Sequence, residues 1–181
     1  MKSSHPFLPG IVLVFSFLAG VALLPTAHAI GPAADVFLGY SRLAADTFYP
    51  NVGGLNGWAG ALHVKVKNRF LGAEGDISEY GLGADGTVPR TTAFMVGPRA
   101  TVGALSVRVF VHGLFGGEHS ANSSGASISG GSFAYALGGG VDVPIAPFFG
   151  WRVAVDHINA PTVSPGDSNH VRLSTGIVFR F

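Results

Sequence analysis

The sequence predicts an all-β fold, an eight-stranded antiparallel up-and-down transmembrane β-barrel. Three observations predict this fold. Short segments alternate between apolar and polar side chains with the period of two that is typical of β-strands. Only 12% of the residues are charged and the mean hydropathy is +0.42, although the one long apolar run lies at the N-terminus. Eight such segments follow one another, and the connections between them are alternately long and short.

The first 29 residues have the composition of a secretory signal peptide. Lys2 precedes an apolar core from about Ile11 to Leu24, and Ala27-His28-Ala29 has the small-x-small pattern of a cleavage site. We expect residues 1–29 to be cleaved and residues 30–181 to form the barrel domain. An uncleaved membrane anchor is the alternative, which the short apolar core disfavours.

The mature region divides into eight predicted strands, at residues 34–43, 56–67, 70–80, 91–102, 106–118, 133–143, 149–158 and 169–181. The connections are long at 44–55, 81–90, 119–132 and 159–168, and short at 68–69, 103–105 and 144–148. Transmembrane barrels keep long connections outside the cell and short turns in the periplasm. Because the strand number is even, both ends of the mature chain should lie in the periplasm.

The second and third predicted strands show the alternation most clearly. In the second strand, the apolar set consists of Trp58, Gly60, Leu62, Val64 and Val66. Its partner set contains the polar residues His63, Lys65 and Lys67. A two-residue turn at 68–69 would place His63 opposite Glu74, with Lys65 diagonal to the same carboxylate. The charges of this hairpin should therefore meet on one face.

Charged side chains of the later strands share that face, and glycine, alanine and serine lie between them. Together with the hairpin charges they form a predicted polar network in the lumen: His63, Lys65, Glu74, Asp76, Arg99, Arg108, His112, Glu118, Asp142, Arg152, Asp156, Arg172 and Arg180. The opposite face is predicted to carry large apolar residues: Phe94, Val96, Val109, Val111, Phe115, Tyr135, Leu137, Val141, Trp151, Val153 and Val155.

A soluble, ligand-carrying barrel would use the same alternation turned inside out. Composition decides between the two arrangements. A basic side chain that faces lipid near the bilayer midplane costs about 2–4 kcal/mol. An eight-stranded barrel has an interior just wide enough for side chains, which small residues and a few long charged ones can fill. We therefore predict that the charges face inward and pair, and that the apolar residues face lipid.

The last strand closes the predicted barrel. Its apolar set is Val171, Leu173, Thr175, Ile177, Phe179 and Phe181, and two arginines lie on the other face. With this strand, and with Gly39-Tyr40-Ser41 and Gly97-Pro98-Arg99, the chain resembles the small OmpA-like outer-membrane β-barrel family. The resemblance implies that Phe179 and Phe181 form an assembly signal for the barrel-assembly machinery. It also implies a location in the outer membrane of a Gram-negative bacterium, after secretion to the periplasm.

We expect no catalytic, cofactor-binding or metal-binding residues. Asp156 and His157 are adjacent on a strand and point to opposite faces, which prevents the direct contact of a Ser-His-Asp hydrolase. The chain has no cysteine, so it has no disulfide framework and no thiol nucleophile. Eleven basic residues less Lys2 leave ten, which equals the ten acidic residues and argues against a nucleic-acid partner.

The sequence therefore predicts a non-enzymatic outer-membrane protein with a structural or surface-interaction role through its extracellular loops. A narrow, porin-like channel is the first alternative, because the lumen is charged. A lipid-modifying enzyme that uses His157 is the second. We expect outer-membrane lipid, the barrel-assembly machinery and an extracellular ligand of the loops as partners, with no cofactor, and we expect a monomer.

Overall fold

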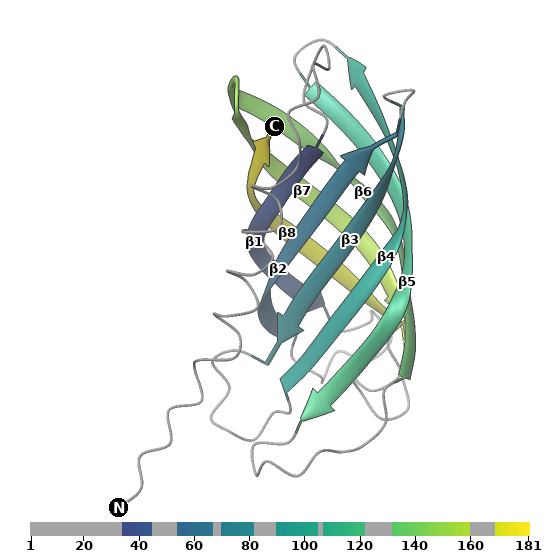
Figure 1. Cartoon of the computed structure of the whole chain (residues 1–181). Coiled ribbons are helices and arrows are strands. Elements are labelled where there is room, and N and C mark those ends of the chain that lie inside the picture. The colour runs from purple at the N-terminus through teal and green to yellow at the C-terminus, as the bar shows by residue number, and fades with distance from the viewer. Residues whose placement is uncertain are drawn as a thin grey trace, which may run out of the picture. The chain divides into compact units, whose positions relative to one another are not determined.

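The computed structural model is a closed barrel of eight antiparallel strands (Figure 1). It describes residues 34–44, 54–66, 70–81, 90–104, 107–121, 132–159 and 169–181. The strands are β1 (Ala34–Ala44), β2 (Leu55–Lys65), β3 (Leu71–Tyr80), β4 (Arg90–Ala104), β5 (Val107–Ala121), β6 (Ser132–Ala146), β7 (Phe149–Asn159) and β8 (Asn169–Arg180). Each strand pairs with its neighbours along the chain, and β1 pairs with β8. The predicted fold class, an eight-stranded antiparallel up-and-down barrel, is confirmed.

The strand bounds differ from the predicted ranges by up to three residues. The prediction ends the sixth strand at residue 143, whereas β6 continues through Pro144 to Ala146. The register against β7 shifts between these two residues, and proline is tolerated at such an irregularity because it lacks an N–H donor. The fifth strand likewise continues to Ala121, beyond its predicted end at residue 118.

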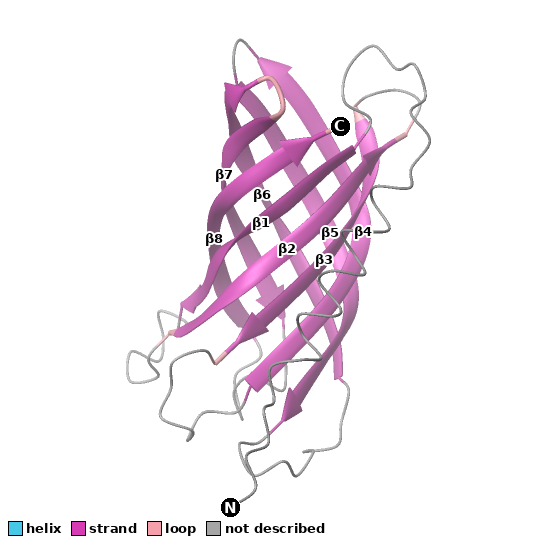
Figure 2. Cartoon of the chain, turned by 60° about the vertical axis from the view of Figure 1, so that its left-hand side comes forward, coloured by secondary structure: helices cyan, strands magenta, loops and turns pink. Residues whose placement is uncertain are grey.

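The described secondary structure consists of the eight strands and the turn between β6 and β7 (Figure 2). No helix in the described ranges is long and apolar enough to cross a membrane. The predicted signal peptide and most of the four long connections lie outside the described residues. Gly81, which follows β3, has a φ of 95° that favours glycine, and its N–H donates to the Asn56 carbonyl at 3.0 Å.

The strand register determines the width of the barrel. Following paired residues once around the barrel from Ala34 leads to Ala44 on the same strand, a shear of ten residues (44 minus 34). Eight strands with this shear tilt by about 40° and enclose a backbone cylinder with a radius of about 8 Å. Such an interior holds side chains and little else.

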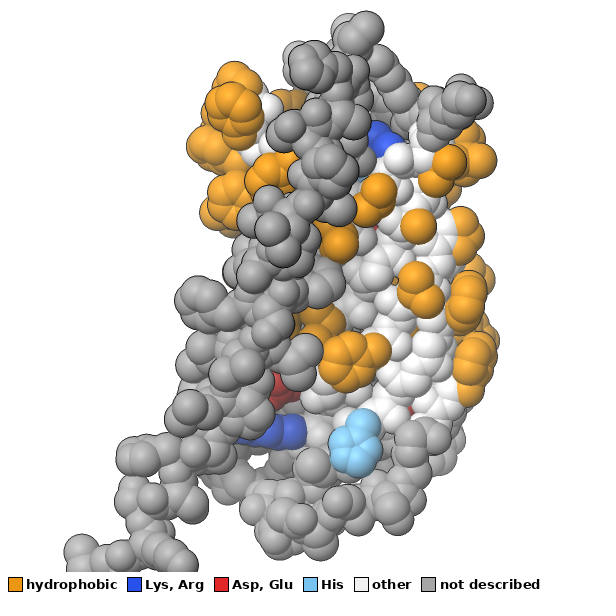
Figure 3. Space-filling view, in the orientation of Figure 1, with side chains coloured by type: hydrophobic (Ala, Val, Ile, Leu, Met, Phe, Trp, Pro, Cys, Tyr) orange, Lys and Arg blue, Asp and Glu red, His pale blue; other side chains and the backbone are white. Residues whose placement is uncertain are grey.

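The outer face carries the large apolar side chains that the alternation predicts. All eleven predicted outward residues, from Phe94 to Val155, are among the exposed large hydrophobic residues. Hydrophobic side chains are spread along the outside of the barrel in Figure 3. The charged residues of the same strands are mostly buried in the lumen. The barrel is therefore inverted relative to a soluble protein, whose core is apolar and whose surface is polar.

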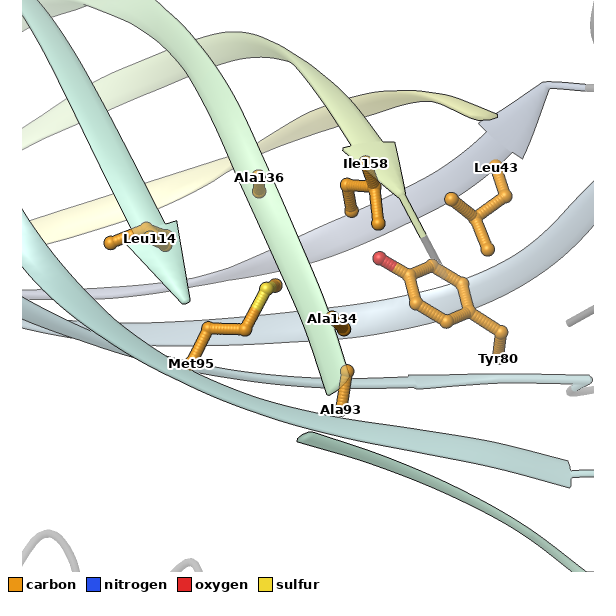
Figure 4. Close-up of a cluster of buried hydrophobic side chains, with 8 residues drawn as sticks. All are labelled: Leu43, Tyr80, Ala93, Met95, Leu114, Ala134, Ala136 and Ile158. Carbon is orange, nitrogen blue, oxygen red and sulfur yellow. The ribbon is translucent and has the colours of Figure 1, made fainter. Parts of the chain in front are cut away.

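A layer of apolar side chains fills the lumen beside the long connections. Figure 4 shows this apolar layer, which consists of Leu43, Tyr80, Ala93, Met95, Leu114, Ala134, Ala136 and Ile158. Tyr80 ends β3, and Leu43 and Ile158 each lie one residue before a strand end. The Tyr80 hydroxyl lies 3.2 Å from Ser41 Oγ, so the buried phenol has a hydrogen-bond partner. The apolar layer packs across the described lumen near this end.

Candidate functional site

A continuous set of ion pairs and hydrogen bonds crosses the lumen. We call it the charge network, and its members are Asp35 (β1), His63 (β2), Glu74 and Asp76 (β3), Arg99 (β4), His112 (β5), Asp142 (β6), Arg152 and Asp156 (β7), and Arg172 (β8). All eight strands contribute, and every member is more than nine-tenths buried. Inward-facing glycine and alanine on the same strands leave room for these long side chains.

Arg99 connects carboxylates from three other strands. Its Nη1 donates to Glu74 Oε2 at 2.7 Å and to Asp35 Oδ1 at 3.4 Å, and its Nη2 donates to Asp142 Oδ2 at 3.4 Å. The guanidinium carbon also lies 3.8 Å from the centroid of the Phe110 ring. A guanidinium is suited to this position because it offers several donors in one plane and stacks on aromatic rings.

Arg152 makes a bidentate pair with Asp142. Arg152 Nε donates to Oδ1 at 2.6 Å, and Nη2 donates to Oδ2 at 3.0 Å. The same Nη2 donates to Asp35 Oδ1 at 3.0 Å. The rings of Phe110 and Phe37 lie 4.7 Å and 5.1 Å from the guanidinium carbon. This combination of parallel hydrogen bonds and aromatic contacts holds Arg152 in one orientation.

His112 and Arg172 extend the charge network toward the apolar layer. His112 Nδ1 lies 2.8 Å from Glu74 Oε1, and its Nε2 lies 2.7 Å from Asp156 Oδ1. Carboxylates accept hydrogen bonds, and His112 supplies a donor to each one when both ring nitrogens carry protons. Arg172 donates to Asp156 Oδ2 at 2.7 Å and to Asp76 Oδ1 at 2.8 Å. Four strands are joined by these contacts.

Asp35 is the network residue that the sequence analysis missed. Its carboxylate lies 2.9 Å from His63 Nδ1 and accepts hydrogen bonds from two arginines. The alternation in β1 contains a signal for it, because Asp35 shares its face with the buried Ser41. That signal is obscured because Phe37 lies on the inward face and the exposed Arg42 lies on the outward face.

The remaining predicted lumen residues lie outside the charge network. Lys65, Arg108 and Arg180 lie at strand ends beside the short connections, whereas the buried Glu118 lies near the long-connection end of β5. The predicted opposition of His63 and Glu74 is confirmed by the register. Outside the lumen, the predicted assembly-signal residues are exposed on the outer face: Phe179 and Phe181.

The outer face carries one member of the adjacent Asp156-His157 pair. His157 is exposed there, whereas Asp156 is buried in the lumen. The two side chains therefore point to opposite faces, as the alternation predicts. Within the described ranges, no group of three or more His, Asp or Glu side chains is arranged to hold a metal ion. In the lumen, the side chains of the charge network cross-link the strands and fill the space between them.

Comparisons with known proteins find the barrel fold in solved structures. No protein-family model matches the chain, and no curated protein matches it. Neisserial surface protein A is similar with a TM-score of 0.60 and 12% identity, over 82% of this chain and 96% of that chain. The N-terminal barrel domain of Pseudomonas aeruginosa OprF has a TM-score of 0.55 and 15% identity, over 83% and 99%.

Ail, the attachment invasion locus protein of Yersinia pestis, has a TM-score of 0.53 and 17% identity, over 84% of this chain and 100% of that chain. These proteins are barrels of nearly the same extent as the described domain, since almost their whole length is covered. At such low identities the likeness shows the fold. The chain has the closed, all-antiparallel, eight-stranded β-barrel fold that is found in outer-membrane proteins.

Proposed function

We propose that the protein is a non-enzymatic, integral outer-membrane β-barrel of a Gram-negative bacterium, similar to the OmpA-like family. The observation that supports this proposal most strongly is the combination of an apolar outer face with a buried charge network. Exposed aromatic residues such as Phe94, Phe115 and Trp151 suit contact with lipid, whereas an apolar surface of this size is rare in soluble monomers. The side chains of the charge network are kept away from lipid and pair with one another in the lumen.

The long connections are the proposed site of surface recognition. Their strand ends all lie at one end of the barrel, and the short connections lie at the other. Among the similar structures, Ail is described by its name as an attachment invasion locus protein, and one Ail structure contains the heparin analogue sucrose octasulfate. These descriptions support recognition as a role for the loops of a barrel of this size.

A conducting pore is the competing proposal, and the filling of the lumen argues against it. An ion that crossed the barrel would have to separate buried ion pairs around Arg99 and Arg152. It would then have to pass the apolar layer around Met95 and Leu114. Both steps are unfavourable because each removes a charge from its partners or from water. We therefore propose a closed barrel.

The orientation can be tested with single cysteines, because the chain contains none. Ser124→Cys places a thiol in the long connection between β5 and β6, and Gly103→Cys places one next to a short connection. A side chain at Gly103 meets nothing within 4 Å, so the control should fold. We expect a membrane-impermeant maleimide to label Ser124→Cys on intact cells. Gly103→Cys should be labelled only after the cells are permeabilised. The reverse pattern, or recovery in the soluble periplasm, would refute the proposal.

Recognition is tested separately from membrane insertion. Replacing residues 122–131 with a Gly-Ser linker should leave outer-membrane assembly and heat-modifiable gel migration intact, because the strands keep their pairing. We expect cells that carry this variant to bind less to a heparin-coated surface than cells with the unchanged protein. If cells with the unchanged protein bind this surface no better than empty-vector cells, recognition of sulfated polysaccharide is excluded. The proposed function is then the structural role alone.

A further inference from the structure

Three cationic side chains lie together where the lumen meets the short connections. Lys65 ends β2, Arg108 is the second residue of β5, and Arg180 ends β8. We call them the basic cluster. Asp142, the register partner of Arg108, and Asp35, the register partner of Arg180, both bind Arg152, so Arg108 and Arg180 approach the same part of the lumen. Lys65 lies two residues after His63, which contacts Asp35, so the three cations lie at the same end of the lumen, where their charges repel one another.

The acidic residues that are the register partners of Arg108 and Arg180 do not pair with these two arginines. Asp35 is the register partner of Arg180, and Asp142 is the register partner of Arg108. Both carboxylates instead bind Arg152 in the charge network, at 3.0 Å and 2.6 Å. In the described part of the chain, no acidic side chain lies within ion-pair distance of Arg108 or Arg180. Arg108 and Arg180 thus have no carboxylate partner among the described residues.

Arg180 has donors that the described residues do not use. Its side chain is buried, with 4% of the residue exposed, and its Nε and Nη2 have no hydrogen-bond partner there. A Cβ at Gly150 would lie 2.9 Å from Arg180 Nη2, so the glycine leaves the space that the guanidinium occupies. Burying a charged donor without an acceptor is unfavourable, which is why such groups usually hold a partner.

We propose that the basic cluster binds a phosphate group at this mouth of the lumen. Arg108 and Arg180 supply guanidinium donors, whose planar geometry matches phosphate oxygens, and Lys65 adds a third positive charge. A bound phosphate would offset the repulsion among the three cations. The group can be a free phosphate ion or the headgroup of a lipid in the adjacent leaflet. Phosphate binding at this site does not depend on the long connections or on the proposed surface role. Under the proposed orientation, the site faces the periplasm.

The test compares Arg108→Gln and Arg180→Gln with a matched control, Arg90→Gln. Arg90 lies at the opposite end of the barrel, its side chain is 59% exposed, and its contact with Glu79 is 3.7 Å long. Inorganic phosphate is titrated by calorimetry into each protein in a phosphate-free maltoside detergent, with sodium chloride of equal ionic strength as the blank. We expect saturable binding to the unchanged protein and the control, and at least tenfold weaker binding to the two cluster variants.

A second titration with dihexanoyl phosphatidic acid distinguishes the two sources of phosphate. Binding of inorganic phosphate supports a site for the free ion, and binding of the short-chain lipid alone supports a headgroup site. The inference is overturned if neither probe binds, if chloride gives the same heat, or if the cluster variants bind as the unchanged protein does. Because the titrations use purified barrel in detergent, their failure would leave the proposed surface role untouched.

Protein stability without phosphate provides an independent readout. Removing one of three repelling cations should leave the denaturant midpoint of Arg180→Gln equal to that of the unchanged protein or above it. Phosphate should raise the midpoint of the unchanged protein and have at most a small effect on the variant. If Arg180→Gln strongly lowers the midpoint without phosphate, the arginine serves to neutralise the charge network, and the proposed site is refuted.

Discussion

Replacing Arg152 with alanine should destabilise the barrel more than any surface substitution. The guanidinium makes three hydrogen bonds to two carboxylates, Asp142 and Asp35, and lies over the rings of Phe110 and Phe37. Truncation removes these contacts and leaves the Asp142 carboxylate with Arg99 Nη2 at 3.4 Å as its remaining ion-pair partner. The expected loss is therefore dominated by a buried negative charge that has lost its closest partner.

Breaking a buried ion pair on one side typically costs about 3–5 kcal/mol. The solvent-accessible pair between Arg90 and Glu79, at 3.7 Å and with side chains that are 59% and 22% exposed, provides the matched control in the same barrel. Exposed pairs contribute about 0–1 kcal/mol, because water screens both partners. Arg152→Ala should thus lower the free energy of unfolding by several times as much as Arg90→Ala.

The measurement is urea unfolding in lipid vesicles, followed by tryptophan fluorescence and by heat-modifiable migration. A double variant, Arg152→Met with Asp142→Leu, removes both charges and should recover much of the lost stability, since no carboxylate is left without its partner. If Arg152→Ala shifts the midpoint no more than Arg90→Ala does, the lumen is hydrated and the argument from burial is wrong.

Three further predictions concern conduction, packing and assembly. In planar bilayers, neither the unchanged barrel nor Arg152→Ala should show steady single-channel openings, because the apolar layer blocks ion passage even when the charge network is broken. Openings in the variant alone would show that only the charge network blocks the lumen. Gly138→Val should destabilise the barrel in urea unfolding, because a Cβ there would collide with the Asp156 carboxylate and lie 2.5 Å from the Val155 carbonyl; an unchanged midpoint would contradict this close approach. Phe181→Ala should reduce the amount of barrel in the outer membrane more than it lowers urea stability, because the resemblance to the OmpA-like family implies a role of this residue in assembly. Normal membrane levels would count against that role.

The sequence contained enough information to predict the fold and the assignment of the two faces. The hairpin of β2 and β3 shows why, since a short connection limits the possible registers and the alternation then fixes which side chains meet. The opposition of His63 and Glu74 follows from that hairpin alone. The hairpin gives no information about Asp35, however. This residue lies on β1, and its carboxylate is the hydrogen-bond partner of His63 on β2.

Contacts across long connections and across the closure of the barrel could not be predicted in the same way. Asp35 meets Arg152 although 117 positions separate them in the chain, and Arg172 meets Asp76 across 96 positions. These contacts depend on the shear of the closed sheet, which no local pattern reveals. The apolar layer is not evident from the sequence for a different reason: charged residues mark the inward face of a strand, whereas an inward apolar residue such as Met95 does not stand out from the outward ones.

The distribution of ion pairs indicates that the charge network selects the strand register. A long connection leaves the register of its two strands open, whereas a tight turn restricts it. Three of the strand pairs that long connections join carry a network contact between them: Asp35–His63, Glu74–Arg99 and Asp156–Arg172.

A slip of one residue in the strand register would turn the charges of a strand toward lipid, at a cost of about 2–4 kcal/mol for a basic side chain near the midplane. A slip of two residues would keep the faces but separate Arg172 from both Asp156 and Asp76. The charge network therefore supplies, at these junctions, the register information that the turns provide elsewhere.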